Sequence, residues 1–111
     1  MKKIIKIETI EDLDNVFNDE RALILKNSSR CPISSGARMK YEDYAIKCDK
    51  DIKFYIIDVI SARNISEEFS KRTGIKHESP QAIILIKGMP VWNKSHYDIN
   101  TISLDDACSK Y

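Results

Sequence analysis

Two apolar runs, residues 22–25 and 54–60, limit the fold of this chain more than any other feature. Runs of this kind are typical of strands buried on both faces of a sheet. Between them lies a helical stripe of apolar residues at i, i+4, i+7, i+8 and i+11, namely Ala37, Tyr41, Tyr44, Ala45 and Cys48. A strand, a helix and a second strand in this order favour parallel pairing with a crossover helix.

The rest of the chain continues the alternation. Residues 2–7 form a short β-rich segment, and Thr9 begins a helix because an acidic residue follows three positions later. Capping-box spacing predicts further helix starts at Asn64 and Ser103, and Gly74 predicts the end of the first of these helices. Residues 82–86 and 90–92 form a hairpin. The predicted order, β-α-β-α-β-α-β-β-α, is an α/β thioredoxin-like fold with a mixed central β-sheet flanked by helices.

Length and charge limit the functions to consider. The 111 residues form one domain, residues 1–111, and 18 basic against 17 acidic side chains leave a net charge of +1. This balance argues against a nucleic-acid partner. Lys6 and Glu8 interrupt the N-terminal apolar residues before a signal peptide could form, and no apolar stretch approaches the roughly 20 residues of a membrane span. We therefore expect a soluble, cytoplasmic monomer with no membrane partner.

Cys31 is the candidate nucleophile. It follows a buried strand and a short polar loop, and Pro32 stands at the expected first position of the next helix, where proline is favoured. The unpaired N–H groups and positive dipole at a helix start favour a thiolate, which is the reactive form of cysteine. Arg30 adds a nearby positive charge. A cap-region cysteine without chemistry is the alternative.

Ser34 occupies the second position of a Cys-x-x-Cys motif. A dithiol enzyme would use a sulfur there to release itself from a mixed disulfide, and serine cannot do this. Its hydroxyl can still donate a hydrogen bond to the Cys31 thiolate, so Pro32, Ile33 and Ser34 are the candidate residues that stabilise or orient the thiolate. The predicted chemistry is monothiol exchange with a small thiol.

Ser79 and Pro80 are the second landmark, directly before the buried run 82–86. In the thioredoxin-like topology a cis proline takes this place and faces the nucleophile, although most X–Pro bonds are trans. The backbone of Ser79 would then pair with an incoming disulfide-linked chain. Ser79 and Pro80 are therefore the candidate substrate-docking residues.

The other two cysteines, Cys48 and Cys108, lie on apolar helical stripes, where packing is the expected role. No pair of Cys or His has the spacing of a structural zinc site, so we expect no metal and no tightly bound cofactor.

Several segments carry a family resemblance. They are Leu25-Lys26, Ser28, Cys31-Pro32-Ile33-Ser34, Arg63, Thr73-Gly74-Ile75, His77-Glu78-Ser79-Pro80-Gln81, Val91-Trp92-Asn93 and Ser95-His96. Over residues 25–99 the chain resembles the monothiol bacilliredoxin family of thioredoxin-fold proteins. One departure is Arg30, where we expect a threonine in the family.

The resemblance implies removal of bacillithiol, a low-molecular-weight thiol, from S-bacillithiolated client proteins. Cys31 would take the bacillithiol, and a second thiol would regenerate Cys31. Bacillithiol is then a co-substrate. Candidate thiol-binding residues are Arg63, His77, Glu78, Asn93 and His96, although each could equally be a solvated surface residue.

Two other functions stay open at this point. One is a redox-inactive thioredoxin-fold module that binds peptides or proteins, which would tolerate any small residue at position 31. The other is a glutathione-linked monothiol enzyme of the glutaredoxin kind.

Overall fold

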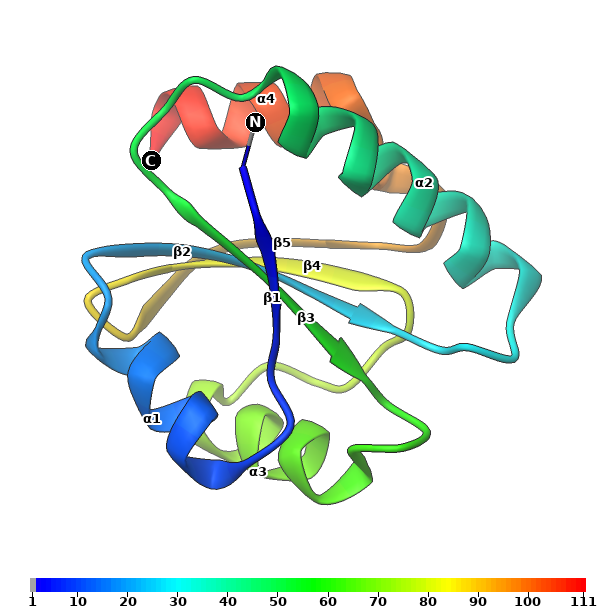
Figure 1. Ribbon diagram of the computed structural model, residues 1–111, viewed down its shortest axis with the longest axis vertical. Coiled ribbons are helices and arrows are strands. Elements are labelled where there is room, and N and C mark those ends of the chain that lie inside the picture. Colours follow the sequence, from blue (N-terminus) through cyan, green and yellow to red (C-terminus); the bar gives the residue numbers. More distant parts are fainter. Residues whose placement is uncertain (1) are drawn as a thin grey trace.

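Five strands form one mixed sheet in the order β1-β3-β2-β4-β5 in the computed structural model, which describes residues 2–111 (Figure 1). The strands are β1 (Ile4–Lys6), β2 (Arg21–Asn27), β3 (Lys53–Asp58), β4 (Gln81–Ile86) and β5 (Met89–Ser95). Strands β1, β3 and β2 are parallel, while β4 runs antiparallel to β2 and β5 antiparallel to β4. The predicted parallel crossover and antiparallel hairpin are both present.

Helices cover both faces of the sheet. They are α1 (Ile10–Asn18), α2 (Pro32–Lys47), α3 (Arg63–Thr73) and α4 (Thr101–Lys110), with a short 3₁₀ turn, η1 (His96–Asp98). Helices α2 and α4 lie on one face, and α1 and α3 lie on the other (Figure 1). The α/β thioredoxin-like architecture predicted from the sequence is confirmed.

The sheet separates two apolar cores because side chains of β2 alternate between its faces. Leu23 and Leu25 pack under α2 and α4, whereas Ala22 and Ile24 pack under α1 and α3. Each fully buried leucine or isoleucine contributes about 1.5–3 kcal/mol relative to an exposed one. Both faces of β2 are therefore buried, which places the loop after it in a rigid setting.

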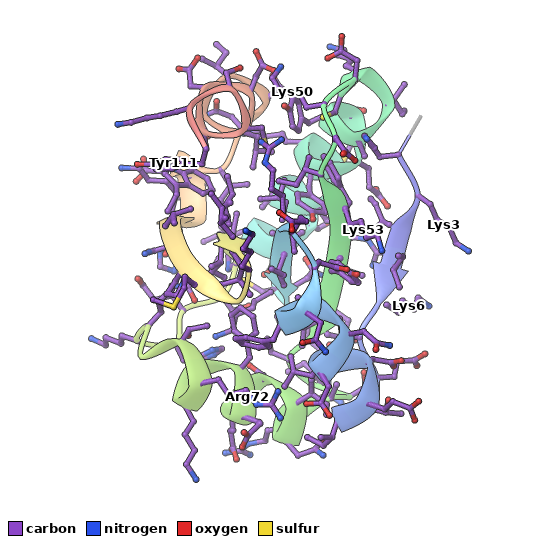
Figure 2. The ribbon with its side chains drawn as sticks, turned by 90° about the vertical axis from the view of Figure 1, so that its left-hand side faces the viewer. Lys3, Lys6, Lys50, Lys53, Arg72 and Tyr111 are labelled. Atoms are coloured by element: carbon purple, nitrogen blue, oxygen red, sulfur yellow. The ribbon has the colours of Figure 1, made fainter. Side chains whose placement is uncertain are left out.

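Polar contacts tie the helices to the sheet and to each other. The buried hydroxyl of Tyr41 in α2 donates to the carbonyl oxygens of Leu23 (2.9 Å) and Tyr55 (2.8 Å). Arg72 of α3 contacts Asp14 of α1 at 2.8 Å and lies between the two helices in Figure 2.

The lysines at the β1 edge, among them Lys6, point away from the ribbon in the same view. Lysines on an edge strand discourage pairing with another chain.

Two predicted helix starts were wrong. Helix α3 begins at Arg63 with Ala62 as its cap, because the Asp58 carboxylate accepts from Ile60 N–H (2.9 Å) and starts the turn early. This places Asn64 inside the helix, where its side chain cannot cap it. Because this turn begins at Asp58, strand β3 also ends there, two residues before the end of the apolar run 54–60.

Helix α4 is capped by Asn100 instead of Ser103. The Asn100 side chain accepts from Ser103 N–H (2.9 Å), and Ser103 Oγ accepts from Asn100 N–H (3.1 Å). Ser103 is thus the third residue of the box. The predicted cap at Thr9 and the predicted stop at Gly74 (φ 72°) are confirmed.

The hairpin turn between β4 and β5 requires its glycine. Gly88 has φ +80°, and a Cβ atom there would come within 2.9 Å of the Phe17 carbonyl oxygen. Within residues 2–111, no helix combines the length and the apolar character that crossing a membrane demands.

Candidate active site

The loop between β2 and α2 is closed by Ser28. Its carbonyl oxygen accepts from Cys31 N–H (3.3 Å), and its hydroxyl accepts from Arg30 N–H (3.4 Å). Cys31 is the cap residue of α2, and Pro32 is the first helical residue, as predicted. A rigid strand and a short closed turn thus hold Cys31 at the start of a 16-residue helix.

The helix start lowers the pKa of the Cys31 thiol. The backbone N–H groups of Ser34 and Ile33 are the two largest causes, and the Ser34 hydroxyl adds a smaller effect in the same direction. Neither N–H completes a capping hydrogen bond in the resting structure, but donors in these positions stabilise a thiolate better than a thiol. Cys31 is also partly exposed, so a disulfide can reach it.

The first turn of α2 contains a buried hydroxyl. Ser34 is fully buried, and within residues 2–111 its Oγ has no hydrogen-bond partner; the same holds for the buried Oδ1 of Asn27 and Oγ of Ser79. The Ser34 hydroxyl is free to donate when Cys31 ionises.

The Ser79–Pro80 peptide bond is cis, and it lies at the same end of the central strands as the Cys31 loop. Lys26, near the end of β2, pairs with Gln81 at the start of β4, so the segment after β2 and the segment before β4 are neighbours. The Pro80 carbonyl oxygen accepts from His96 N–H (2.9 Å), which joins this segment to the end of β5.

A groove of about 670 Å³ opens on the Arg30 side of Cys31. We call it the α3 groove; its walls include Arg30, Ile60, Arg63, Ser66, Ser70 and His77. It brings together Arg63 and His77, two of the predicted thiol-binding residues. Burial and the nearby charge of Lys26 lower the pKa of His77, which favours the neutral imidazole at pH 7.

A smaller hollow of about 170 Å³, the α2 pocket, opens on the Pro32 side. Its walls include Pro32, Ile33, Lys40, His96, Tyr97 and Ile99. The two chain neighbours of Cys31 therefore each line one hollow, Arg30 the α3 groove and Pro32 the α2 pocket.

The remaining predicted thiol-binding residues are not brought into the α3 groove. His96 lines the α2 pocket, and Glu78 lies beside it, 3.7 Å from His96 Nδ1 and accepting from Ser95 Oγ at 3.0 Å. Asn93 is exposed in β5 and lines neither hollow. The five residues therefore divide between two places.

Three residues were not predicted from the sequence: Ser66 and Ser70 in the wall of the α3 groove, and Lys26, which contacts Ser70. Lys26 is fully buried in β2, and Nζ donates to Ser70 Oγ (3.2 Å) and Gln81 Oε1 (3.4 Å). A signal existed: a lysine directly after an apolar run lies inside the same buried strand. The two serines are one helical turn apart, a spacing that gains meaning only once α3 is placed.

Cys48 and Cys108 lie outside the site, buried beneath α2 and α4. Cys48 follows a 16-residue helix that begins after Cys31, so the two are roughly 24 Å apart along its axis. In the described part of the chain all three cysteines are free, and no three potential ligand side chains gather as a metal site.

Comparison with solved structures shows the thioredoxin fold. A protein described as a candidate oxidoreductase with a thioredoxin fold matches with a TM-score of 0.85 and 35% identity, covering 94% of this chain and 92% of the other. A thioredoxin from Halobacterium salinarum matches at 0.79 and 15% identity, covering 98% and 90%. Oxidised thioredoxin from Plasmodium falciparum matches at 0.77 and 15%, covering 98% of each chain. The last two show the fold alone.

The family is shown by a separate match. The family model described as Monothiol bacilliredoxin BrxC matches residues 3–104, nearly the whole chain. Both the family and the fold support a thiol–disulfide oxidoreductase. The chain therefore belongs to the monothiol bacilliredoxin family of thiol oxidoreductases.

Proposed function

We propose that this protein removes bacillithiol from S-bacillithiolated client proteins, with Cys31 as the nucleophile. The observation that carries the proposal is the position of Cys31. It is partly exposed, caps α2 where backbone N–H groups lower the pKa of its thiol, and is flanked in the chain by Arg30 and Pro32, each of which lines a hollow. This arrangement suits a thiolate that must meet a mixed disulfide with two different halves.

In the first step the Cys31 thiolate attacks the bacillithiol sulfur of the client's mixed disulfide. A Cys31–bacillithiol disulfide forms as the old disulfide breaks, and the client sulfur leaves as a thiolate that takes a proton from solvent. The client is reduced, and Cys31 carries the adduct.

In the second step an external bacillithiol thiolate attacks the bacillithiol sulfur held on Cys31. The products are bacillithiol disulfide and the regenerated Cys31 thiolate. Ser34 cannot perform this step because it has no sulfur, so turnover needs the external thiol. Attack on the client sulfur in the first step would instead leave a protein–protein disulfide that Ser34 cannot resolve.

The other site residues have proposed roles in the same cycle. Pro32 fixes the start of α2, and the Ile33 and Ser34 donors hold the thiolate. The backbone of Ser79, positioned by Pro80, pairs with the client chain.

The two hollows then serve the two halves of the mixed disulfide. The α3 groove, with Arg63 and His77, receives the small thiol. The α2 pocket, with His96 beside Glu78, contacts the client. Asn93 has no contact that supports a role in thiol binding.

Intact-mass analysis tests the proposal. The protein is mixed with an S-bacillithiolated client, and both masses are followed with time; a parallel reaction uses an S-glutathionylated client. We expect the client to lose its bacillithiol while a one-to-one adduct appears on the enzyme. Faster loss of glutathione would favour the glutaredoxin-like alternative. If Cys31→Ser demodifies the client equally well, the oxidoreductase proposal is wrong and the binding-module hypothesis replaces it.

A further inference from the structure

Lys26 is a fully buried cation near the end of the central strand β2. Its Nζ has two neutral acceptors, Ser70 Oγ at 3.2 Å and Gln81 Oε1 at 3.4 Å, and forms no ion pair within residues 2–111. The Gln81 amide is held in this orientation because its Nε2 donates to the Lys76 carbonyl oxygen (3.2 Å). Buried charges in proteins are normally paired with an opposite charge or neutralised. Lys26 is therefore a buried charge whose direct contacts are all neutral.

The α3 groove lies directly above this amine. Ser70 lines the groove, and since its Oγ already accepts from Lys26, its own O–H is free to point outward. Ser66, one turn earlier on α3, places a second hydroxyl in the same wall. An anion in the groove would thus meet hydroxyl donors backed by a buried ammonium.

The balance of charge around the groove is positive. Arg30 and Arg63 are at its walls, and Glu67 is the acidic residue among the lining side chains. The Glu67 carboxylate is engaged by Arg63 Nε at 3.2 Å in an exposed pair, which is a weak interaction. Glu78 also acts on Lys26 by its charge, but its carboxylate contacts Ser95 and His96 outside the groove.

Lys26 keeps its charge at neutral pH. Burial lowers the pKa of the amine to about 8, and the negative charge of Glu78 opposes the change. An anion beside Ser70 would raise this pKa again because it favours the ammonium form.

We propose that the α3 groove is the subsite for the carboxylate-bearing part of the low-molecular-weight thiol, with the Ser70 hydroxyl and Lys26 beneath it as its buried donor pair. The inference rests on the proposed function, since it assumes that the small thiol joins Cys31. It adds the residues that hold the carboxylate of that thiol. Arg30, beside Cys31, and Arg63 would steer the carboxylate into the groove.

Two small disulfide reagents distinguish the effect of the groove from the reactivity of Cys31. One is 5,5′-dithiobis(2-nitrobenzoic acid), which carries two carboxylates, and the other is 4,4′-dithiodipyridine, which is uncharged at neutral pH. The rate constant of each with Cys31 is measured at pH 7, with Cys31→Ser subtracted. The uncharged probe reports the reactivity of Cys31, on which the proposed function depends. The ratio of the anionic to the uncharged rate constant reports the groove.

Removing a positive charge or a donor should lower the ratio of the two rate constants, and removing a negative charge should raise it. We expect Lys26→Met to lower the ratio by roughly tenfold, since it removes a charged donor, and Ser70→Ala to lower it by a smaller factor. Arg63→Gln should lower the ratio by about threefold and Glu67→Gln should raise it by a similar factor, the size of an exposed charge effect. Lys71→Met, an exposed lysine of α3 outside the groove lining, is the matched control and should leave the ratio unchanged.

Arg63→Gln and Glu67→Gln alter exposed side chains, so both should fold even if Lys26→Met does not. A ratio that stays constant in these two variants would overturn the subsite. A ratio that responds to them but is unchanged in correctly folded Lys26→Met would overturn the role of the buried amine. If Cys31 of the wild-type protein does not react with the uncharged probe, the proposed function is contradicted instead.

Discussion

Cys31 and Cys108 are the same side chain in opposite surroundings. Cys31 begins α2, is partly exposed, and has the pKa of its thiol lowered by the N–H groups of Ser34 and Ile33. Cys108 is 2% exposed between α4 and the sheet, and burial raises the pKa of its thiol to about 11. The comparison teaches that the backbone around a sulfur decides whether it reacts or packs.

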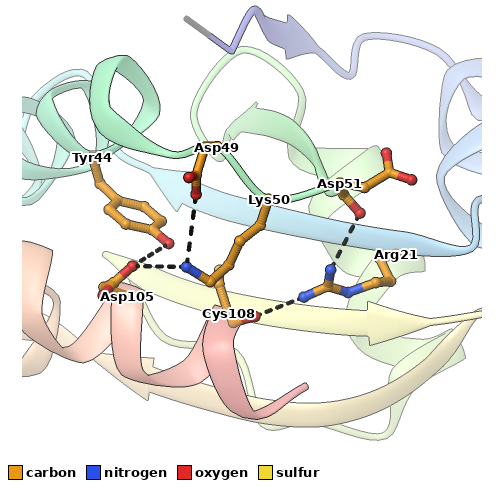
Figure 3. A network of polar contacts seen from close by, with 7 residues as sticks. All are labelled: Arg21, Tyr44, Asp49, Lys50, Asp51, Asp105 and Cys108. Carbon is orange, nitrogen blue, oxygen red and sulfur yellow. Dashed lines mark hydrogen bonds and ion pairs between the residues drawn. The ribbon is translucent and has the colours of Figure 1, made fainter.

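The surroundings of Cys108 are closed by polar contacts as well as by apolar packing (Figure 3). Arg21 Nη2 donates to the Cys108 carbonyl oxygen at 2.8 Å, and the Tyr44 hydroxyl donates to Asp105 Oδ1 at 3.0 Å. These bonds tie the end of α4 to β2 and α2. At the start of α2 the equivalent space is open, with a hollow on each side.

The largest expected effect is on the rate of client demodification, which should depend on Cys31 and not on Cys108. Cys31→Ser should lower the rate of client demodification by at least about a thousandfold, because the nucleophile is removed. Cys108→Ala should keep a rate near that of wild type, since its thiol is buried and protonated. Mass-resolved demodification of one client by the three proteins tests this pair. An active Cys31→Ser, or an inactive but folded Cys108→Ala, would reverse the assignment.

The two thiols should also have opposite effects on stability as the pH changes. Cys108 has a folded-state pKa of about 11 against an ordinary value of 9.0, so the folded state binds more protons between these limits. Stability from this group is therefore complete below about pH 9 and is lost as pH rises toward 11, by roughly 2–3 kcal/mol. Cys31 has a lowered pKa, so its contribution is present at high pH and is lost on acidification.

Urea unfolding at several pH values between 9 and 11 measures this difference. Cys108→Ala should lose less stability across the range than wild type, and Cys31→Ser should lose as much as wild type. Burial also raises the pKa of Tyr44, and Cys108 adds to this rise, so Cys108→Ala removes that part of the Tyr44 effect as well. Parallel curves for wild type and Cys108→Ala would contradict the raised pKa.

A second sulfur beside Cys31 would change the mechanism. Ser34→Cys places a thiol in the buried first turn of α2, where we expect it to displace the adduct and form an internal disulfide. The dependence of turnover on external bacillithiol should fall by about tenfold, because an intramolecular thiol has a high effective concentration. Turnover at limiting thiol and the mass of the oxidised protein provide the measurement. An unchanged thiol dependence would mean that position 34 cannot reach the adduct.

The smallest expected effect concerns the Ser34 hydroxyl. Ser34→Ala should raise the pKa of Cys31 only slightly, because the hydroxyl is a lesser cause than the two backbone N–H groups. The pH dependence of Cys31 alkylation measures this change. A larger increase would make the side chain, and not the helix start, the main source of activation.

Much of the fold could be predicted from the sequence because it depends on local patterns. The apolar runs identified β2 and β3, and Lys87-Gly88 identified the hairpin turn, where both residues have positive φ. Two helix starts could not be found in this way. At Ala62 no side chain signals the cap, and the turn that begins α3 comes from Asp58, whose role depends on the end of β3.

The site could be predicted only where its reactive residue and the local pattern that positions it are adjacent in the sequence. Cys31-Pro32 after a buried strand carried its own signal, so the cap of α2 was correctly placed. The α3 groove had no such signal, because it joins Arg30 to side chains of α3 and to His77, which are distant in sequence. Lys26 was missed because a lysine is usually exposed, and only the pairing of β2 with strands on both sides shows that it is buried.

A direct pH titration of the Cys31 thiol tests the central claim, that the start of α2 activates this sulfur. Ultraviolet absorbance of the thiolate is recorded against pH for the native protein, with Cys31→Ser as the blank. We predict a midpoint below the ordinary thiol pKa, and no thiolate from Cys108 until the pH approaches 11. A Cys31 midpoint at or above about 8.5 would contradict the account.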